Sequence, residues 1–144
     1  MRHVSNHSVK RVAAIVTLLI ISFSATASPL HAALRAGAAR IDITPTKPVK
    51  MSGYGARTAL SEGVHDPLSA RAVAFESGGK RLVLVSCDLI GFYESTAEHF
   101  RKLITAEFKL EPSELFLCGI HTHGAPTPTI DKEKGHPNNL EYTK

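Results

Sequence analysis

The chain has 144 residues, of which 17 are Lys or Arg and 13 are Asp or Glu. Three of the basic residues (Arg2, Lys10 and Arg11) and none of the acidic ones lie in the first 27 residues, which leaves 14 basic against 13 acidic residues beyond them. This near balance provides no basic patch of the kind that binds nucleic acid, so we expect no nucleic-acid partner.

The first 27 residues predict a secretory signal peptide. The basic start precedes an almost wholly apolar run, VAAIVTLLIISFSATA (residues 12–27), which ends in the small-x-small cleavage pattern Ala25-Thr26-Ala27. Cleavage as late as Ala33 is an alternative, and a membrane anchor is the competing interpretation, although the apolar run is short for a membrane span. We therefore expect a secreted or periplasmic protein with one small domain.

The next segments predict strands separated by a long loop. GAARIDITP (residues 37–45) alternates apolar and polar residues, as a half-buried strand does, and Pro45 ends it. Residues 46–67 are rich in Gly, Pro, Ser and Lys and have no period, so they predict a loop. Two strand-like runs, residues 68–76 and 81–88, then flank Gly78-Gly79, which predicts a hairpin. The second run is apolar on both faces, as a central strand is.

A helix follows the hairpin and leads to another strand. Ser95-x-x-Glu98 has the form of a capping box. Apolar residues then recur at helical spacing for about three turns: Ala97, Phe100, Leu103, Ile104 and Phe108. Pro112 ends this pattern, and ELFLCGI (residues 114–120) predicts a strand that is buried on both faces. Strand, helix and strand form a βαβ unit with parallel strands.

These elements predict an α/β fold whose mixed sheet contains a hairpin and a βαβ unit. Only one helix is available to cover a sheet that needs layers on both sides. We therefore expect residues 34–130 to be the incomplete N-terminal portion of a larger two-sheet α/β domain, followed by a polar, unpatterned tail at residues 131–144. Cys87 and Cys118 lie in strand-like runs, so we favour two buried thiols over a disulfide.

The sequence IHTHGAP places two histidines where the last strand stops. In an extended strand, residues two apart point to the same side, about 6.5–7 Å apart, so His121 and His123 can reach one point beyond the strand's end. Neutral imidazole binds zinc, and zinc activates water to attack a carbonyl. His-x-His alone is a weak motif, and the alternative is a strand end with one histidine bonded to a carbonyl and the other solvated.

Four other features are candidates for a role in a site. Asp88 ends the neighbouring strand and either orients an imidazole or caps the following turn. Asp66 fits an Asx-type turn, and Arg71, inside an apolar strand, is expected to pair with a carboxylate or a carbonyl. The segment MSGYG, with Ser52 and Tyr54, either lines a pocket or forms a tight turn.

Taken together, these segments resemble the N-terminal part of the neutral/alkaline (non-lysosomal) ceramidase family. The matching pieces are RAGAARIDITP, MSGYGAR, GVHDPLSARAVAFE, RLVLVSCDLIG and LCGIHTHGAP, in this order, across about residues 34–128. The resemblance implies a secreted or membrane-associated zinc amidase that hydrolyses the N-acyl bond of a sphingoid amide. It implies that His121 is a zinc ligand and that His123 is a catalytic residue near the substrate or the attacking water.

The resemblance also implies that the site needs more polypeptide. The family has Ser-Gly-Pro-Gly-Gly after its histidines, where this chain has Gly-Ala-Pro-Thr-Pro (residues 124–128). The family's remaining ligands, a histidine, a glutamate and a tyrosine, come from much farther along a longer chain. We therefore expect three partners: a lipid-like amide substrate, a membrane surface that the protein reaches through that substrate, and the missing C-terminal portion of the enzyme. The chain alone should have little or no amidase activity.

Two other functions are consistent with parts of the sequence. One is an exported, non-catalytic binding or structural domain that keeps only the scaffold. The other is a metal hydrolase of the amidohydrolase type, with His-x-His at the end of a barrel strand. A barrel needs repeated βα units, and the hairpin at Gly78-Gly79 argues against it.

Overall fold

A computed structural model describes residues 32–93 and 95–144 of the chain. The predicted signal peptide, residues 1–27, lies outside the described residues. In the part of the chain that the structure describes, no helix has both the length and the apolar character needed to cross a membrane.

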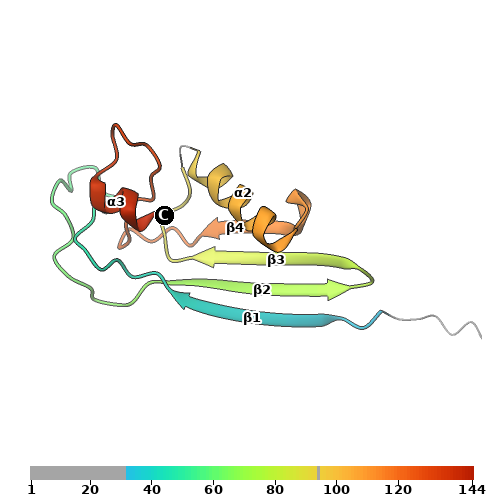
Figure 1. Cartoon of the computed structure of the whole chain (residues 1–144). Helices are drawn as coiled ribbons and strands as arrows, with labels where there is room; N and C mark the ends of the chain where they lie inside the picture. Colours follow the sequence, from blue (N-terminus) through green and yellow to red (C-terminus); the bar gives the residue numbers. More distant parts are fainter. Residues whose placement is uncertain (1–31, 94) are drawn as a thin grey trace, which may run out of the picture. The chain divides into compact units, whose positions relative to one another are not determined.

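The described residues form a four-stranded mixed sheet with the order β1-β2-β3-β4 (Figure 1). The first three strands are antiparallel neighbours, whereas β3 and β4 are parallel and are joined by α2. The elements are β1 (Arg35–Asp42), β2 (Ser69–Ser77), β3 (Lys80–Cys87), α2 (Thr96–Phe108), the 3₁₀ turn η1 (Pro112–Glu114), β4 (Leu115–Gly119) and α3 (Pro137–Tyr142). The predicted fold class, a mixed sheet with a hairpin and a βαβ unit, is confirmed.

The hairpin between β2 and β3 has its turn at the predicted position. Ser77 pairs with Lys80, so Gly78 and Gly79 are the two central residues of the turn. Their φ angles are 56° and 74°. Two consecutive positive φ values match the right-handed twist of the flanking strands, and glycine adopts them without steric cost.

The sheet is less buried than the sequence predicted. Every residue of β1 is exposed, so the prediction of a half-buried strand is wrong for this element. In β4, Phe116 is 56% exposed, which contradicts the expected burial on both faces. The reason is that β1 and β4 are the edge strands and that α2, the only helix that joins strands within the described residues, covers one face (Figure 1).

The strand register separates a covered face from an uncovered one. Val85 and Leu117 are partners in the register and pack against the core, and Phe100 of α2 contacts Phe92 above them. Leu84 and Phe116, also partners, lie on the opposite face and are exposed. Alternate residues point to opposite faces of a strand, which explains the division.

The same register settles the geometry of the two cysteines. Cys87 pairs with Gly119, and Cys118 pairs with Ser86, so the two thiols project from opposite faces of adjacent strands. Both are free in the structure. Cys87 is buried, as predicted, whereas Cys118 is only half-buried, so the expectation of two buried thiols is wrong for Cys118. Burial raises the pKa of the Cys87 thiol above its usual value.

Helix α2 begins differently from the prediction. Ser95 is its N-cap, but the residue has a φ of 65° and its side chain makes no capping hydrogen bond. The Thr96 hydroxyl instead donates to the Tyr93 carbonyl. The expected capping box at Ser95 is therefore wrong, because a capping side chain reaches the helix N–H groups from an extended backbone. A capping box does occur at η1, between Glu111 and Glu114.

The core lies at the end of the sheet where β3 and β4 stop. Cys87, Leu89 and Ala125 form its buried centre. Helix α3, in a segment where the sequence showed no pattern, contributes Tyr142, which packs against this cluster, and Asn139, which is 1% exposed. The C-terminal ends of the parallel strands are thus the best-packed part of the described chain.

Candidate functional site

His121 is held by the loop that follows β3. Its backbone N–H donates to the Leu89 carbonyl at 3.0 Å, and the N–H of Ile120 donates to the Cys87 carbonyl at 3.0 Å. The His121 side chain is exposed, and its Nδ1 lies 2.9 Å from the Ile90 carbonyl oxygen. A carbonyl only accepts, so Nδ1 is the donor of this bond. The other ring nitrogen, Nε2, is therefore the atom available to a metal.

Two glycines allow this loop to approach β4 so closely. A Cβ atom on Gly119 would lie 2.9 Å from both the Cα and the N atom of Gly91 and 2.9 Å from the Leu89 carbonyl oxygen. No real Cβ tolerates such contacts with backbone, so a side chain at residue 119 would push the loop away. The backbone then turns at His121, which has a φ of 65°. The strand ends at Gly119, one residue before the predicted end.

His123 is held by a different loop, residues 51–57. The Tyr54 ring meets the His123 ring edge-to-face, with centroids 4.9 Å apart. Gly53, with a φ of 98°, lies so close that a Cβ on it would be within 3 Å of the Cβ, Cγ and Nδ1 atoms of His123. Arg57 Nη1 donates to the His123 carbonyl at 3.0 Å. The ring and the backbone of His123 are thus both fixed.

The two imidazoles are neighbours. Their ring centroids lie 5.3 Å apart, with an interplanar angle of 67°. The extended strand that we predicted does not continue through both residues, because the backbone turns at His121, which has a φ of 65°. The rings nevertheless meet at the predicted place, beyond the end of β4, where ligands bind in open α/β sheets.

The pair fits a part of a zinc site. No group of three or more His, Cys, Asp or Glu side chains that could hold a metal occurs within residues 32–93 and 95–144. His121 nevertheless has the arrangement typical of a metal ligand, in which one ring nitrogen donates to a carbonyl and the other faces outward. The donor set therefore fits one zinc ligand, with a second histidine beside it.

Asp88 does not orient either histidine. Its carboxylate accepts two hydrogen bonds from Arg71, at 2.7 and 3.1 Å, and a third from the Ser69 N–H at 2.9 Å. The hydrogen bonds from Arg71 lower the pKa of Asp88. The expectation that Arg71 pairs with a carboxylate is confirmed. Asp88 was predicted either to orient an imidazole or to cap the following turn, and both predictions are wrong. Its carboxylate joins β2 to the end of β3, and the Ile90 carbonyl orients the His121 imidazole.

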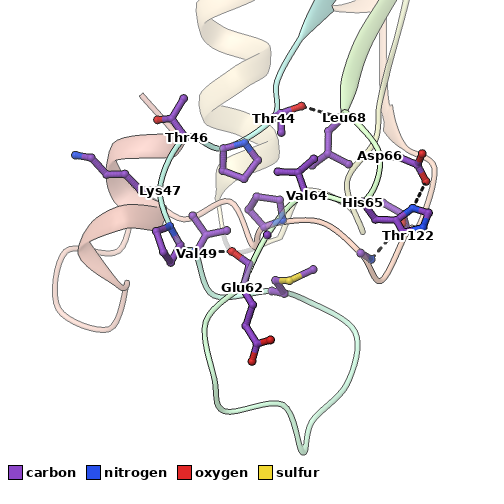
Figure 2. Close-up of a pocket in the computed structure, with 17 residues that line it drawn as sticks. Thr44, Thr46, Lys47, Val49, Glu62, Val64, His65, Asp66, Leu68 and Thr122 are labelled. Carbon is purple, nitrogen blue, oxygen red and sulfur yellow. Dashed lines mark hydrogen bonds and ion pairs between the residues drawn. The ribbon is translucent and has the colours of Figure 1, made fainter.

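A pocket of about 400 Å³ opens beside the histidine pair (Figure 2). It lies between segments 44–51, 61–68 and 122–126, and neither His121 nor His123 lines it. Thr122, which lies between the two histidines in the sequence, does line the pocket. The walls are largely apolar and include Val49, Met51, Val64, Leu68 and three prolines.

One polar pair marks the rim of this pocket. His65 Nδ1 lies 2.7 Å from Asp66 Oδ2, and both side chains are strongly exposed. The carboxylate of Asp66 thus contacts the neighbouring imidazole, where the sequence suggested an Asx-type turn. Figure 2 shows this pair on the Thr122 side of the pocket. The pocket therefore combines an apolar wall with a polar rim next to the histidines.

Sequence reasoning missed three groups that build the site. The Ile90 carbonyl carries no residue-specific signal, because any residue supplies one. Gly53 lies in the segment MSGYG, which we interpreted as either a pocket lining or a tight turn, and its contact with His123 joins residues 70 positions apart. Arg57 lies two residues beyond that segment, and its charge gave no signal, because most charged loop residues are solvated and its partners are backbone carbonyls.

Comparison with solved structures identifies similar proteins. Among solved structures, a neutral ceramidase from Pseudomonas aeruginosa matches with 28% sequence identity and a TM-score of 0.59. The chain resembles neutral ceramidase. The match covers 67% of this chain, which spans 16% of that enzyme.

A second solved structure gives the same result. A ceramidase complexed with C2 is 29% identical, with a TM-score of 0.52 and the same coverage of the two chains. No family model and no curated protein matches the sequence. The resemblance to a part of neutral ceramidase, which the sequence motifs suggested, is therefore confirmed by the fold.

Proposed function

We propose that this chain supplies part of the active site of a secreted or periplasmic, ceramidase-like hydrolase that cleaves an N-acyl amide with zinc. One observation carries the proposal: His121 stands at the C-terminal end of a parallel strand, with Nδ1 bonded to the Ile90 carbonyl and Nε2 directed away from it. The similarity to solved neutral ceramidases supports the reaction class. The apolar run after a basic start supports export.

His121 and His123 have different roles in this proposal. Zinc, when bound, polarises a carbonyl oxygen and provides a nucleophile at neutral pH. His121 would hold the metal through Nε2, with its ring fixed by the Ile90 carbonyl. His123, whose ring centroid is 5.3 Å from that of His121, would hydrogen-bond the substrate amide or the attacking water. The remaining ligands would come from other polypeptide, as in the family that the sequence resembles.

The substrate would use the pocket beside Thr122. Its volume of about 400 Å³ lies in the usual range of small-molecule sites. Apolar walls suit the alkyl part of a lipid-like amide, and the His65–Asp66 pair and Thr122 offer polar partners at the end nearest the histidines. Such a substrate would also bring the protein to membrane surfaces.

Zinc titration followed by NMR of the histidine rings tests the ligand assignment. We expect zinc to change the Nε2 resonance of His121 first, and His121→Ala to weaken binding at least tenfold, or about 1.4 kcal/mol. His99→Ala is the matched control, because His99 lies on α2 and its ring contacts Phe100. Its affinity should equal that of the wild type.

Two results would change this view. If zinc shifts the resonances of other histidines and leaves those of His121 unchanged, the proposal is contradicted and an exported, non-catalytic domain is favoured. We expect little or no amidase activity from the 144-residue chain alone. Zinc-dependent turnover of an N-acyl sphingoid amide by the purified chain would mean that it completes the site by itself.

A further inference from the structure

The loop of residues 51–57 is fastened to the segment that carries His123. Met51 and Pro126 form an isolated antiparallel bridge, and the Ser52 N–H donates to the Ala125 carbonyl at 3.1 Å. The hydroxyls of Ser52 and Thr127 lie 2.6 Å apart. Ser52, Ala125 and Pro126 are buried. These bonds lie outside the four-stranded sheet and set the distance between the loop and the histidine segment.

The loop contacts the His123 side chain through two residues, Gly53 and Tyr54. Gly53 packs its backbone against the ring at a distance that admits no side chain. Tyr54 places its ring edge-to-face with the imidazole, at 4.9 Å between centroids. Such aromatic pairs contribute a specific orientation in addition to apolar contact.

Arg57 contacts both the loop and the segment that carries His123. Its Nη1 donates to the carbonyls of His123 and Ser52, at 3.0 and 3.3 Å, so one guanidinium bridges the two segments. Its Cζ atom also lies 4.8 Å from the centre of the Tyr54 ring. A cation over an aromatic face is attracted to it. Arg57 therefore fixes both the His123 backbone and the ring that contacts the His123 side chain.

We propose that Tyr54 and Arg57 are positioning residues for His123, and that loop 51–57, and not the loop that holds His121, sets the orientation of this imidazole. The two histidines have separate supports, because His121 is held by the Leu89 and Ile90 carbonyls of another loop, and they meet only where their rings are edge-to-face, 5.3 Å apart between centroids. The consequence for catalysis rests on the proposed function. The orientation itself is a property of this chain and needs no metal.

The test is NMR of the full chain without zinc, with the ring resonances of both histidines assigned. In Tyr54→Leu, we expect the His123 ring protons to lose the ring-current shift that the Tyr54 ring produces, while the His121 signals change less, and only through the contact of its ring with that of His123. Tyr54→Phe keeps the ring and should restore the His123 shift. Tyr54 is 59% exposed, so neither variant removes buried core.

Arg57 is tested in the same way. Arg57→Met keeps the length of the side chain but loses both hydrogen bonds that Nη1 donates, so the His123 signals should shift or broaden. Arg57→Lys keeps one charged donor and should recover part of the wild-type spectrum. A second pair of variants tests the packing: Gly53→Ala should displace the ring, whereas Gly55→Ala should not, because a Cβ there meets nothing within 4 Å.

Two outcomes would overturn the proposal. One is an unchanged His123 spectrum in Tyr54→Leu and Arg57→Met. The other is an equal change at His121 and His123, which would mean that the variants loosen the whole region. Zinc titration of the same samples separates this proposal from the hydrolase proposal. Loss of the His123 shift in a protein that binds no zinc through His121 would support the positioning role and contradict the zinc assignment.

Discussion

The loops at the end of the sheet are packed more tightly than the strands that carry them. Leu89 and Ala125, in loops, are 4% and 0% exposed, whereas Leu84 in β3 is 37% exposed and every residue of β1 is exposed. Function usually lies in loops that a rigid scaffold positions. Here the rigidity around the histidines is built largely by the loops themselves, through side chains that bond to backbone groups of distant segments.

Asn139 is the residue whose loss should disturb this end most. Its amide donates to the carbonyls of Lys50 and Thr127, at 2.8 and 2.9 Å, and its Oδ1 accepts from the Lys50 N–H at 2.8 Å. Asn139→Ala would leave the Lys50 N–H and the Thr127 carbonyl without these partners, each at a cost of about 1–3 kcal/mol, whereas the Lys50 carbonyl keeps its bond from the Thr127 N–H. We expect a loss of about 3–5 kcal/mol in the free energy of unfolding, measured with urea.

The neighbouring asparagine is the matched control. The half-buried Asn138 makes one side-chain bond, from Nδ2 to the Pro48 carbonyl at 2.6 Å, which is open to solvent. Asn138→Ala should cost about 1 kcal/mol or less. Equal losses for the two variants would contradict the conclusion that buried side-chain bonds stabilise the loop end.

The ion pair between Asp88 and Arg71 should have the next largest effect. Asp88 is 7% exposed, and its carboxylate ties the end of β3 to β2. Asp88→Asn keeps the shape but loses the charge-assisted bonds, and we expect a loss of about 1–2 kcal/mol at neutral pH, because the Arg71 side chain remains half exposed. Urea unfolding at pH 7 measures it.

The same pair predicts a dependence on pH. Hydrogen bonds from Arg71 lower the pKa of Asp88 in the folded state. The stabilisation is therefore complete above the unfolded pKa of about 3.9 and is lost as the pH falls through the lower, folded value. The difference in stability between wild type and Asp88→Asn should shrink toward zero in acid. A difference that persists below the folded pKa would contradict the assignment.

Local pattern predicted the elements of this fold but not their burial. The Gly-Gly turn and the change from strand to helix periodicity identified the hairpin and the βαβ unit, because each signal lies within one short segment. Exposure of Phe116 depends on what covers the sheet, which no periodicity within β4 encodes. The edge position of β4 likewise follows from the order of all four strands.

The candidate site was also predictable only in part. The motif His-Thr-His located the two rings, since it lies at the end of an apolar run. Their supports, the Ile90 carbonyl and Gly53, come from segments 31 and 70 residues away, and only the folded register brings them there. Side-chain to backbone bonds are especially hard to predict, because the backbone partner is the same chemical group at every residue.

The smallest effect is expected where the strands are most exposed. Arg35 and Glu76 face each other across β1 and β2 and form an ion pair at 2.9 Å, with side chains 75% and 44% exposed. Solvent screens such a pair, so Glu76→Gln should change the free energy of unfolding by less than about 0.5 kcal/mol, and added salt should reduce even that. Urea unfolding in low and high salt measures both. A loss above about 1 kcal/mol would mean that an exposed edge pair stabilises as much as the buried carboxylate of Asp88, and the contrast between strands and loops would then not hold.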